Sequence, residues 1–331
     1  MLWWCALYFA IAVAGTWLAR RYALRRDLID QPGERRSHSV ATPRGGGIAI
    51  VIALLVAAIA LALRYPQQIV LLAAFVIGLV LVAGIGLLDD HRPLSPWLRL
   101  AVHAMAAAVF ALGAAGVYGD PSTALVAFVV VMVLTNVWNF MDGINGIAAS
   151  QAVLVSAGLA AVVAGPWTWL ALALVAACVG FLPFNFPRAR IFLGDVGSGA
   201  LGYALAVLSV VAYADHALPW TLLALPFAAF LVDSALTLLR RLLRGERWWT
   251  PHTQHAYQGW AARIRAHAPV TLAYAGWTAV AGLLAWWLRS VPESYAIAVL
   301  LAWYAATAYL WWRLQHRMWT MPLGSREMDK E

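Results

Sequence analysis

Long apolar stretches recur along the whole chain and limit the folds open to it. Each has about 18 or more residues, enough to cross a hydrocarbon core of about 30 Å as a helix. Inside hydrocarbon every backbone N–H and C=O group needs an internal partner, so only helices and closed barrels can cross it. These stretches do not alternate between polar and apolar residues as barrel strands do. The sequence therefore predicts an all-α integral membrane protein.

We predict about eleven transmembrane helices. They cover residues 2–19, 45–63, 69–88, 98–116, 122–140, 144–164, 168–184, 197–214, 219–239, 270–288 and 295–312. Only 11% of the residues are charged, against about 25% in soluble domains. No polar stretch is much longer than about 25–30 residues, which leaves no room for a separate soluble domain. Residues 1–331 are therefore predicted to form a single polytopic membrane domain.

The basic residues divide unequally between the two predicted sides of the membrane. With eleven spans, 21 of the 23 Lys and Arg residues fall on the side of the longer loops, and only Arg64 and Arg289 fall on the other. Lys and Arg accumulate on the cytoplasmic side of membrane proteins. The N-terminus is therefore predicted to be periplasmic and the C-terminus cytoplasmic. The simplest interpretation of most of these arginines is that they set topology and contact anionic lipid head groups.

Three separate segments bring carboxylates to the predicted cytoplasmic face. Asp89 and Asp90 end the third span, Asp142 follows the fifth, and Asp195 precedes the eighth. Alone, Asp142 is compatible with a turn and Asp195 with a helix N-cap. The adjacent pair is harder to explain structurally, because two like charges repel and require a metal ion or nearby cations. Mg²⁺ with a diphosphate substrate fits carboxylates that have arginines nearby.

Two histidines, His252 and His255, lie in the largest late loop, residues 240–269. As a zinc site the pair is weak, because no cysteine is near and no third ligand is evident. A structural role and a role in binding diphosphate or sugar both remain open for the pair.

Five stretches of the sequence resemble those of a known family. The matching stretches are "DQPGERRSHSVATPRGGG" (30–47), "GLLDDHRPLS" (86–95), "NVWNFMDGINGIA" (136–148), "NFPRARIFLGDVGSGALGY" (185–203) and "RRLLRGERWWTPHTQHAYQ" (240–258). In this order they resemble the polyprenyl-phosphate N-acetylhexosamine-1-phosphate transferases, the WecA/MraY superfamily of glycosyl transferase family 4. All of them lie on the predicted cytoplasmic side, so the resemblance places the active site on the cytoplasmic loops.

The resemblance also implies roles for individual residues. Asp195 resembles the principal Mg²⁺ ligand and, with Asp89 and Asp90, is expected to be catalytic. Asp89 and Asp90 are expected to handle the lipid phosphate. The residues expected to bind substrate are Thr42, Arg44, Asn139, Asp142, Asn145, Asn185, Arg188, His252 and His255. Among these, Asn145 is expected nearest to uracil, although many family members have Asp at its position.

The implied reaction is Mg²⁺-dependent transfer of N-acetylhexosamine 1-phosphate, or its deoxy form, from a UDP-sugar to undecaprenyl phosphate, with release of UMP. Mn²⁺ is the alternative ion. Attack by the lipid phosphate on the β-phosphorus and a covalent route through a carboxylate both remain open. The expected partners are the UDP-N-acetylhexosamine donor, the polyprenyl phosphate acceptor and membrane lipid, with no nucleic acid; a homodimer is an open alternative to a monomer. The expected location is the bacterial cytoplasmic (inner) membrane.

The late motif distinguishes branches of the family. Here it is His-x-x-His followed by "AYQ", not the consecutive histidines of the peptidoglycan branch. This pattern resembles the WbpL-type branch most, which implies initiation of O-antigen or a related surface glycan in lipopolysaccharide or cell wall biogenesis. The peptidoglycan and teichoic-type branches remain alternatives.

Proteins of other classes make different predictions. A secondary transporter would carry ionisable residues in mid-span. The sequence offers only His103 and Asp233, and Asp233 lies close to the end of its predicted span. A structural scaffold would need neither converging carboxylates nor a metal.

Overall fold

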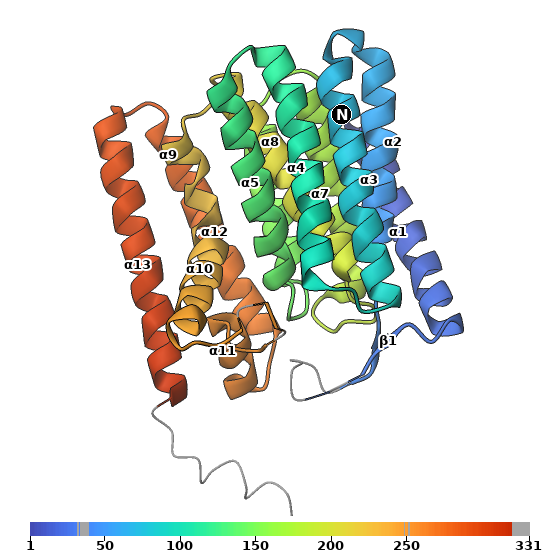
Figure 1. The fold of residues 1–331 in the computed structure, drawn as a ribbon, viewed down its shortest axis with the longest axis vertical. Coiled ribbons are helices and arrows are strands. Elements are labelled where there is room, and N and C mark those ends of the chain that lie inside the picture. Colours follow the sequence, from blue (N-terminus) through green and yellow to red (C-terminus); the bar gives the residue numbers. More distant parts are fainter. Residues whose placement is uncertain (32, 34–39, 248, 251, 320–331) are drawn as a thin grey trace, which may run out of the picture.

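The computed structural model is a bundle of helices that run roughly along one direction (Figure 1). It describes residues 1–31, 33, 40–247, 249–250 and 252–319; for 317–319 it describes the helix alone. Part of the first-loop motif (32 and 34–39), two positions of the late motif (248 and 251) and the tail from 320 lie outside the described residues. The elements are α1 (Leu2–Arg25), β1 (Ile29–Asp30), β2 (Thr42–Pro43), α2 (Ile48–Arg64), η1 (Pro66–Gln68), α3 (Ile69–His91), α4 (Pro96–Tyr118), α5 (Pro121–Phe140), α6 (Ile147–Ala160), α7 (Pro166–Asn185), α8 (Asp195–Ala214), α9 (Trp220–Leu223), η2 (Leu225–Phe227), α10 (Ala228–Leu243), α11 (Ala256–Ile264), α12 (Ala268–Leu288) and α13 (Glu293–Trp319).

The helical prediction is confirmed. Within the described residues, nine helices or continuous helical runs are long and apolar enough to cross a membrane, and α2 and α6 are shorter apolar helices. The chain is therefore an integral membrane protein, whereas the count of eleven crossings and their orientation stay predictions. Figure 1 supports the predicted grouping of loops, since β1 and α11 lie at one end of the bundle and the N-terminus at the other.

Prolines set several helix starts. Pro96, Pro121 and Pro166 each occupy the first helical position, and their helices begin one or two residues before the predicted spans. Proline suits this position because its fixed φ is already helical and its missing N–H has no intrahelical partner there. At the start of α5, Asp120 adds a side-chain cap by accepting hydrogen bonds from the backbone N–H groups of Ser122 and Thr123.

Two loop predictions need correction. The long late loop contains a helix, α11, that the sequence did not predict. Its nine residues are too few and too polar to be recognised as an apolar membrane span. The first loop (residues 30–47) is rich in Pro, Gly and Ser, which predicts an irregular structure. The flanks of its undescribed part nevertheless pair as two short antiparallel strands, with Ile29 opposite Pro43 and Asp30 opposite Thr42. The two ends of this loop are thereby held together.

The centre of the bundle is α8, which is almost wholly buried and packs against α3 and α5. Glycines allow these close contacts. A Cβ atom on Gly86 of α3 would lie 2.4 Å from the carbonyl oxygen of Asp195, and one on Gly202 of α8 would lie 2.2 Å from the carbonyl oxygen of Leu134. Small residues permit such close helix packing in membranes. The first turn of α8 is thus fixed directly beside the end of α3, where Asp89 and Asp90 lie.

Candidate active site

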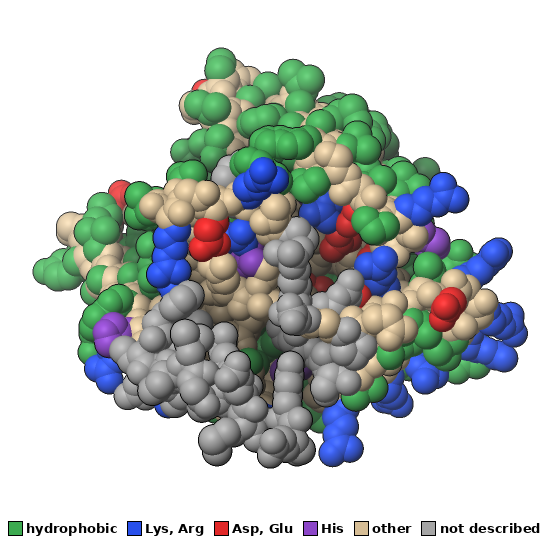
Figure 2. Space-filling view, turned by 60° about the horizontal axis from the view of Figure 1, so that its bottom comes forward, with side chains coloured by type: hydrophobic (Ala, Val, Ile, Leu, Met, Phe, Trp, Pro, Cys, Tyr) green, Lys and Arg blue, Asp and Glu red, His purple; other side chains and the backbone are tan. Residues whose placement is uncertain are grey.

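A pocket of about 760 Å³ opens at the end of the bundle where the predicted cytoplasmic loops gather. Figure 2 shows this face, with acidic side chains recessed in a hollow and basic side chains distributed around it. Of the twelve predicted site residues, nine line the pocket: Arg44, Asp89, Asp90, Asn139, Asp142, Asn185, Asp195, His252 and His255. Segments far apart in sequence therefore converge here, as the carboxylate pattern predicted.

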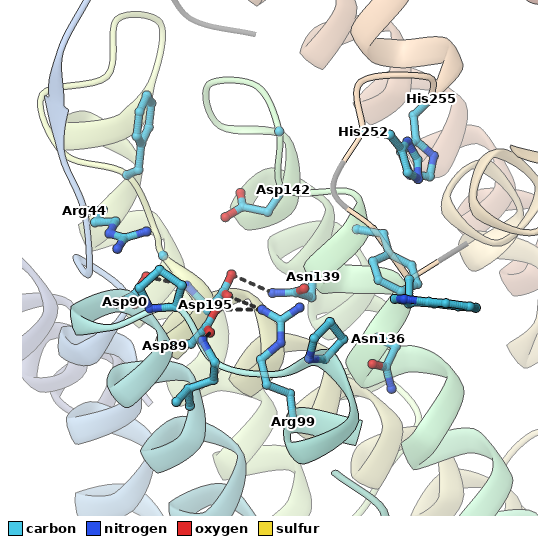
Figure 3. Close-up of a pocket in the computed structure, with 18 of the residues that line it drawn as sticks. Arg44, Asp89, Asp90, Arg99, Asn136, Asn139, Asp142, Asp195, His252 and His255 are labelled. Carbon is cyan, nitrogen blue, oxygen red and sulfur yellow. Dashed lines mark hydrogen bonds and ion pairs between the residues drawn. The ribbon is translucent and has the colours of Figure 1, made fainter. Parts of the chain in front are cut away.

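The central contact of the pocket is made by Arg99, in the first turns of α4. Its Nη1 atom lies 2.7 Å from Oδ2 of Asp89 and 2.6 Å from Oδ2 of Asp195 (Figure 3). One guanidinium nitrogen thus joins two carboxylates from α3 and α8. The other oxygen of Asp89 accepts a 2.6 Å hydrogen bond from the backbone N–H of Leu94. The cation offsets the repulsion that two neighbouring carboxylates would otherwise suffer.

Asn139 holds the other side of Asp195. Its Nδ2 atom donates to Oδ1 of Asp195 and to Oγ of Ser198, both at 2.9 Å. Because Arg99 and Asn139 contact different oxygens of Asp195, the carboxylate is fixed from both sides. An amide placed this way orients a carboxylate without adding charge.

Asp90 has a different environment from its neighbour. It is 3% exposed, and its two oxygens accept hydrogen bonds of 3.1 Å from the backbone N–H groups of Asp195 and Val196. It therefore caps the start of α8, where unpaired N–H groups and the helix dipole favour a negative charge. Gly194 makes room for this contact, since its φ is +76° and a Cβ atom there would lie 2.5 Å from Oδ2 of Asp90. The cap of α8 comes from α3, and Asp195 occupies the first helical position instead of the N-cap.

Asp142 projects into the pocket from the loop between α5 and α6 (Figure 3). Within the described residues no group donates a hydrogen bond to its carboxyl oxygens. Burial, followed by the charges of Asp195 and Asp90, raises the pKa of Asp142 well above its usual range. Among the described residues that line the pocket there are five aspartates and two arginines, and this formal charge favours binding of a cation.

Two asparagines hold loops together. Asn185 is buried; its Oδ1 accepts a 2.7 Å hydrogen bond from the N–H of Gly146, and its Nδ2 donates to the carbonyl of Ile191 at 2.9 Å. Asn145 donates from Nδ2 to the carbonyl of Pro187 at 3.1 Å and does not line the pocket. The predicted uracil contact of Asn145 stays a prediction, and the visible role of this residue is to join two loops.

Thr42 and Arg188 were also predicted to bind substrate, and neither lines the pocket. Thr42 is buried in β2 and donates to the carbonyl of Val40 at 2.9 Å. Arg188 is exposed in the loop between α7 and α8. Arg44, two residues after Thr42, and Asn185, three residues before Arg188, do line the pocket. In each of these two motifs one predicted residue therefore lines the pocket and the other lies elsewhere in the loop.

The late histidines lie across the pocket from Arg44 (Figure 3). Their ring centroids are 4.9 Å apart. His255 is 2% exposed, and its Nδ1 lies 3.5 Å from Oδ1 of Asp233, whereas His252 is half-buried. Of the pair, His252 is thus the histidine more accessible to a ligand, and His255 belongs to the junction that anchors α11.

Sequence reasoning missed Arg99 as a site residue, since it was counted only as a topological charge. The signal was available: a lone arginine just inside an apolar span, ten positions after Asp89. It also treated His103 only as an intramembrane candidate. In the structure His103 lines the pocket one helical turn beyond Arg99, with Nδ1 3.2 Å from Oδ1 of Asn136.

The donor set fits a hard divalent cation. Within the described residues, no cluster of three or more His, Cys, Asp or Glu side chains is preassembled around one point. Mg²⁺ does not require one, because it is usually held by one or two carboxylates, water and substrate phosphate. The stand-in cation is the guanidinium of Arg99, which already bridges Asp89 and Asp195. Asp89 and Asp195 are therefore the residues that would hold such an ion.

Comparison with known proteins gives the family that this chain resembles. The sequence model of glycosyl transferase family 4 matches residues 72–213, which include Asp89, Arg99, Asn139, Asp142 and Asp195. Over these residues the chain is similar to this family. It is 28% identical to a decaprenyl-phosphate N-acetylglucosaminephosphotransferase of Mycobacterium leprae, over 82% of this chain and 78% of that one.

Other relatives come from two branches. A probable undecaprenyl-phosphate N-acetylglucosaminyl 1-phosphate transferase of Bacillus subtilis is 28% identical, over 72% of this chain and 71% of its own. A phospho-N-acetylmuramoyl-pentapeptide-transferase of Moorella thermoacetica is 33% identical, over 56% of this chain and 66% of its own. The family resemblance predicted from the motifs is therefore confirmed, and the WbpL-type branch stays a prediction.

Proposed function

We propose that the protein transfers N-acetylhexosamine 1-phosphate, or a deoxy form of it, from a UDP-sugar to undecaprenyl phosphate and releases UMP. The observation that carries this proposal is the Asp89–Arg99–Asp195 contact inside a pocket at one end of the bundle. Two of the relatives named above are transferases that act on a polyprenyl phosphate, which supports the same class of reaction.

The acceptor and the donor are both anionic, so the pocket must offset charge. Mg²⁺, with Mn²⁺ as alternative, would be held by Asp195 with Asp89 beside it, and would supply charge neutralisation at the transferring phosphoryl group. Among the described residues, Arg44 and Arg99 are the arginines that line the pocket, and they would provide cationic hydrogen-bond donors for phosphate oxygens. Asn139 keeps Asp195 in one orientation.

The geometry supports direct attack of the lipid phosphate on the β-phosphorus. A new P–O bond forms from a lipid phosphate oxygen, and the bond to the UMP oxygen breaks. A covalent route through Asp89, Asp90 or Asp195 would require an available oxygen on that carboxylate. Both oxygens of Asp89 accept hydrogen bonds, as do both oxygens of Asp90 and Asp195. Hydrogen bonding of this kind weakens a nucleophile, so these carboxylates are better suited to positioning and to metal binding.

The donor is best sought among the UDP-N-acetylhexosamines. N-acetylglucosamine stands in the names of several relatives, and the His-x-x-His motif favours the O-antigen type of pathway predicted above. A muramoyl-pentapeptide donor is the second candidate, favoured by the relative from Moorella thermoacetica. We further propose an inner-membrane location with the pocket facing the cytoplasm, since the predicted basic loops gather at that end.

The experiment is UMP release by the purified protein in detergent. It receives undecaprenyl phosphate and a panel of UDP-N-acetylhexosamines together with UDP-N-acetylmuramoyl-pentapeptide, each with Mg²⁺ and with EDTA. We expect release that requires lipid and metal and that selects one or two hexosamines. Release with the muramoyl donor alone would move the protein to the peptidoglycan branch. No release with any donor, from folded protein, would contradict the proposal and reopen the transporter alternative.

A further inference from the structure

Arg99 occupies the place where a cation shared by Asp89 and Asp195 would be expected. A single atom, Nη1, contacts Oδ2 of both carboxylates, at 2.7 and 2.6 Å. A divalent ion held by the same two oxygens would have to lie close to this nitrogen, since Mg²⁺–oxygen distances are about 2.0–2.1 Å. At such separations a guanidinium and a metal ion repel each other strongly in a partly buried site.

We propose that Arg99 is a resident counter-cation that the divalent metal displaces, so that metal binding and release of the guanidinium are one exchange. The inference rests on the metal requirement of the proposed function. In the metal-free protein Arg99 keeps Asp89 and Asp195 together. When the metal binds, it takes over this role, and the arginine leaves the carboxylates.

The surroundings of Asp195 indicate which partner leaves. Asn139, which contacts the other oxygen, is uncharged and also bonds to Ser198, so a metal ion does not repel it. Arg99 carries a full charge, and its side chain is 27% exposed. The pocket of about 760 Å³ gives this long side chain room to rotate. The guanidinium is therefore the group that moves.

The exchange has a consequence for substrate binding. Before metal binds, the charge of Arg99 is used internally by two carboxylates. Afterwards the guanidinium faces the pocket and is available to phosphate oxygens, which it binds in a bidentate manner. Metal and phosphate should therefore favour each other's binding, and by thermodynamic linkage the effect is reciprocal.

The test measures Mn²⁺ binding by EPR of the free ion, with no nucleotide and no lipid phosphate added. Removing the competing charge in Arg99→Gln should tighten Mn²⁺ binding by about tenfold or more relative to wild type. Arg92→Gln is the matched control, because Arg92 is exposed on the connection between α3 and α4 and does not line the pocket. It should bind Mn²⁺ as the wild type does. Equal or weaker binding by folded Arg99→Gln would overturn the exchange and leave Arg99 as a structural brace.

A second measurement uses the wild-type chain, in case Arg99→Gln does not fold. The ¹⁵N-arginine spectrum is recorded during a Mg²⁺ titration, and the Arg99 signal is assigned by its absence in Arg99→Lys. The exchange predicts that this signal shifts on Mg²⁺ binding while that of Arg92 does not. A stationary Arg99 signal at saturating Mg²⁺ would overturn it. UMP release is assayed separately with the wild-type protein, so tightened Mn²⁺ binding by Arg99→Gln together with no turnover by the wild type would contradict the proposed function and not the exchange.

Discussion

Two buried aspartates make the same contact in different parts of the molecule. Asp90 of α3 accepts the N–H groups of Asp195 and Val196 at the start of α8. Asp233 of α10 accepts those of Ala256 and Tyr257 at the start of α11, at 2.9 and 3.1 Å. Each is almost fully buried, with 3% and 1% exposure. In both places a carboxylate from one helix caps another that is distant in sequence.

The surroundings of the two caps differ. Asp233 also accepts hydrogen bonds from the hydroxyls of Thr237 and Tyr274 and lies beside His255. At the start of α8, the first residue of the helix that Asp90 caps is Asp195, which is itself acidic. The charge of Asp233 at the start of α11 is therefore satisfied within the protein, and this junction serves as a support. The junction of Asp90 with α8 instead carries surplus negative charge into the pocket. The same capping contact produces an anchor or a reactive site according to the first residue of the capped helix, which is Ala256 in α11 and Asp195 in α8.

The largest effect is expected at the reactive junction. Asp195→Asn keeps the shape of the side chain and removes the charge that would hold the metal, so UMP release should fall by about 10²–10³-fold. Size-exclusion behaviour in detergent should stay that of the wild type. Asp120→Asn, at the other end of the bundle, is the control and should retain activity. Full turnover by Asp195→Asn would remove the distinction between the two junctions.

The two capping aspartates should contribute differently to the free energy of unfolding. Asp233→Ala leaves two buried N–H groups without partners and should cost about 3–5 kcal/mol. Asp90→Ala leaves two as well but also removes repulsion with Asp89 and Asp195, so its cost should be smaller. Reversible unfolding in mixed micelles with increasing SDS measures both. An Asp90→Ala variant that loses more stability than Asp233→Ala would refute this account of the charge surplus.

A finer test divides the Asp233 junction into its parts. Tyr274 donates a 2.7 Å hydrogen bond to Oδ2 of Asp233, and such bonds to carboxylates contribute about 1.5 kcal/mol or more. Tyr274→Phe should lose about this much stability in the same SDS titration, with turnover within about twofold of wild type. A loss of turnover much larger than the loss of stability would mean that the support also takes part in the reaction.

The smallest effect concerns pH at the reactive junction. The raised pKa of Asp142 means that the folded state binds more protons than the unfolded state once pH exceeds the unfolded pKa of about 3.9. Asp142 therefore lowers stability increasingly as pH rises toward its folded pKa. Asp142→Asn in metal-free buffer should raise Tm by about 2 °C at pH 8 and leave it unchanged at pH 3.5. A Tm difference independent of pH would exclude a titration of Asp142 as the cause.

Much of the site could be predicted from sequence because its carboxylates lie at the ends of apolar spans. An aspartate there is costly unless it has a task, and the alternation of spans brings Asp89, Asp142 and Asp195 to one end. The cations were harder to predict. Arg99 looked like one of many topological charges, and only the contact of α3, α4 and α8 distinguishes it from Arg92.

The sequence by itself determined the class of fold, the long apolar helices, the family resemblance and the end of the bundle at which the acidic residues meet. Apolar length and motif order are local properties, so they can be read without coordinates. The tertiary structure decided which carboxylate caps and which faces the pocket, and which asparagine lines the pocket and which joins loops. Asp89 and Asp90 are neighbours in sequence, yet successive side chains on a helix point in different directions. Only the packing of α8 against α3 sends one to Arg99 and the other to the backbone of α8.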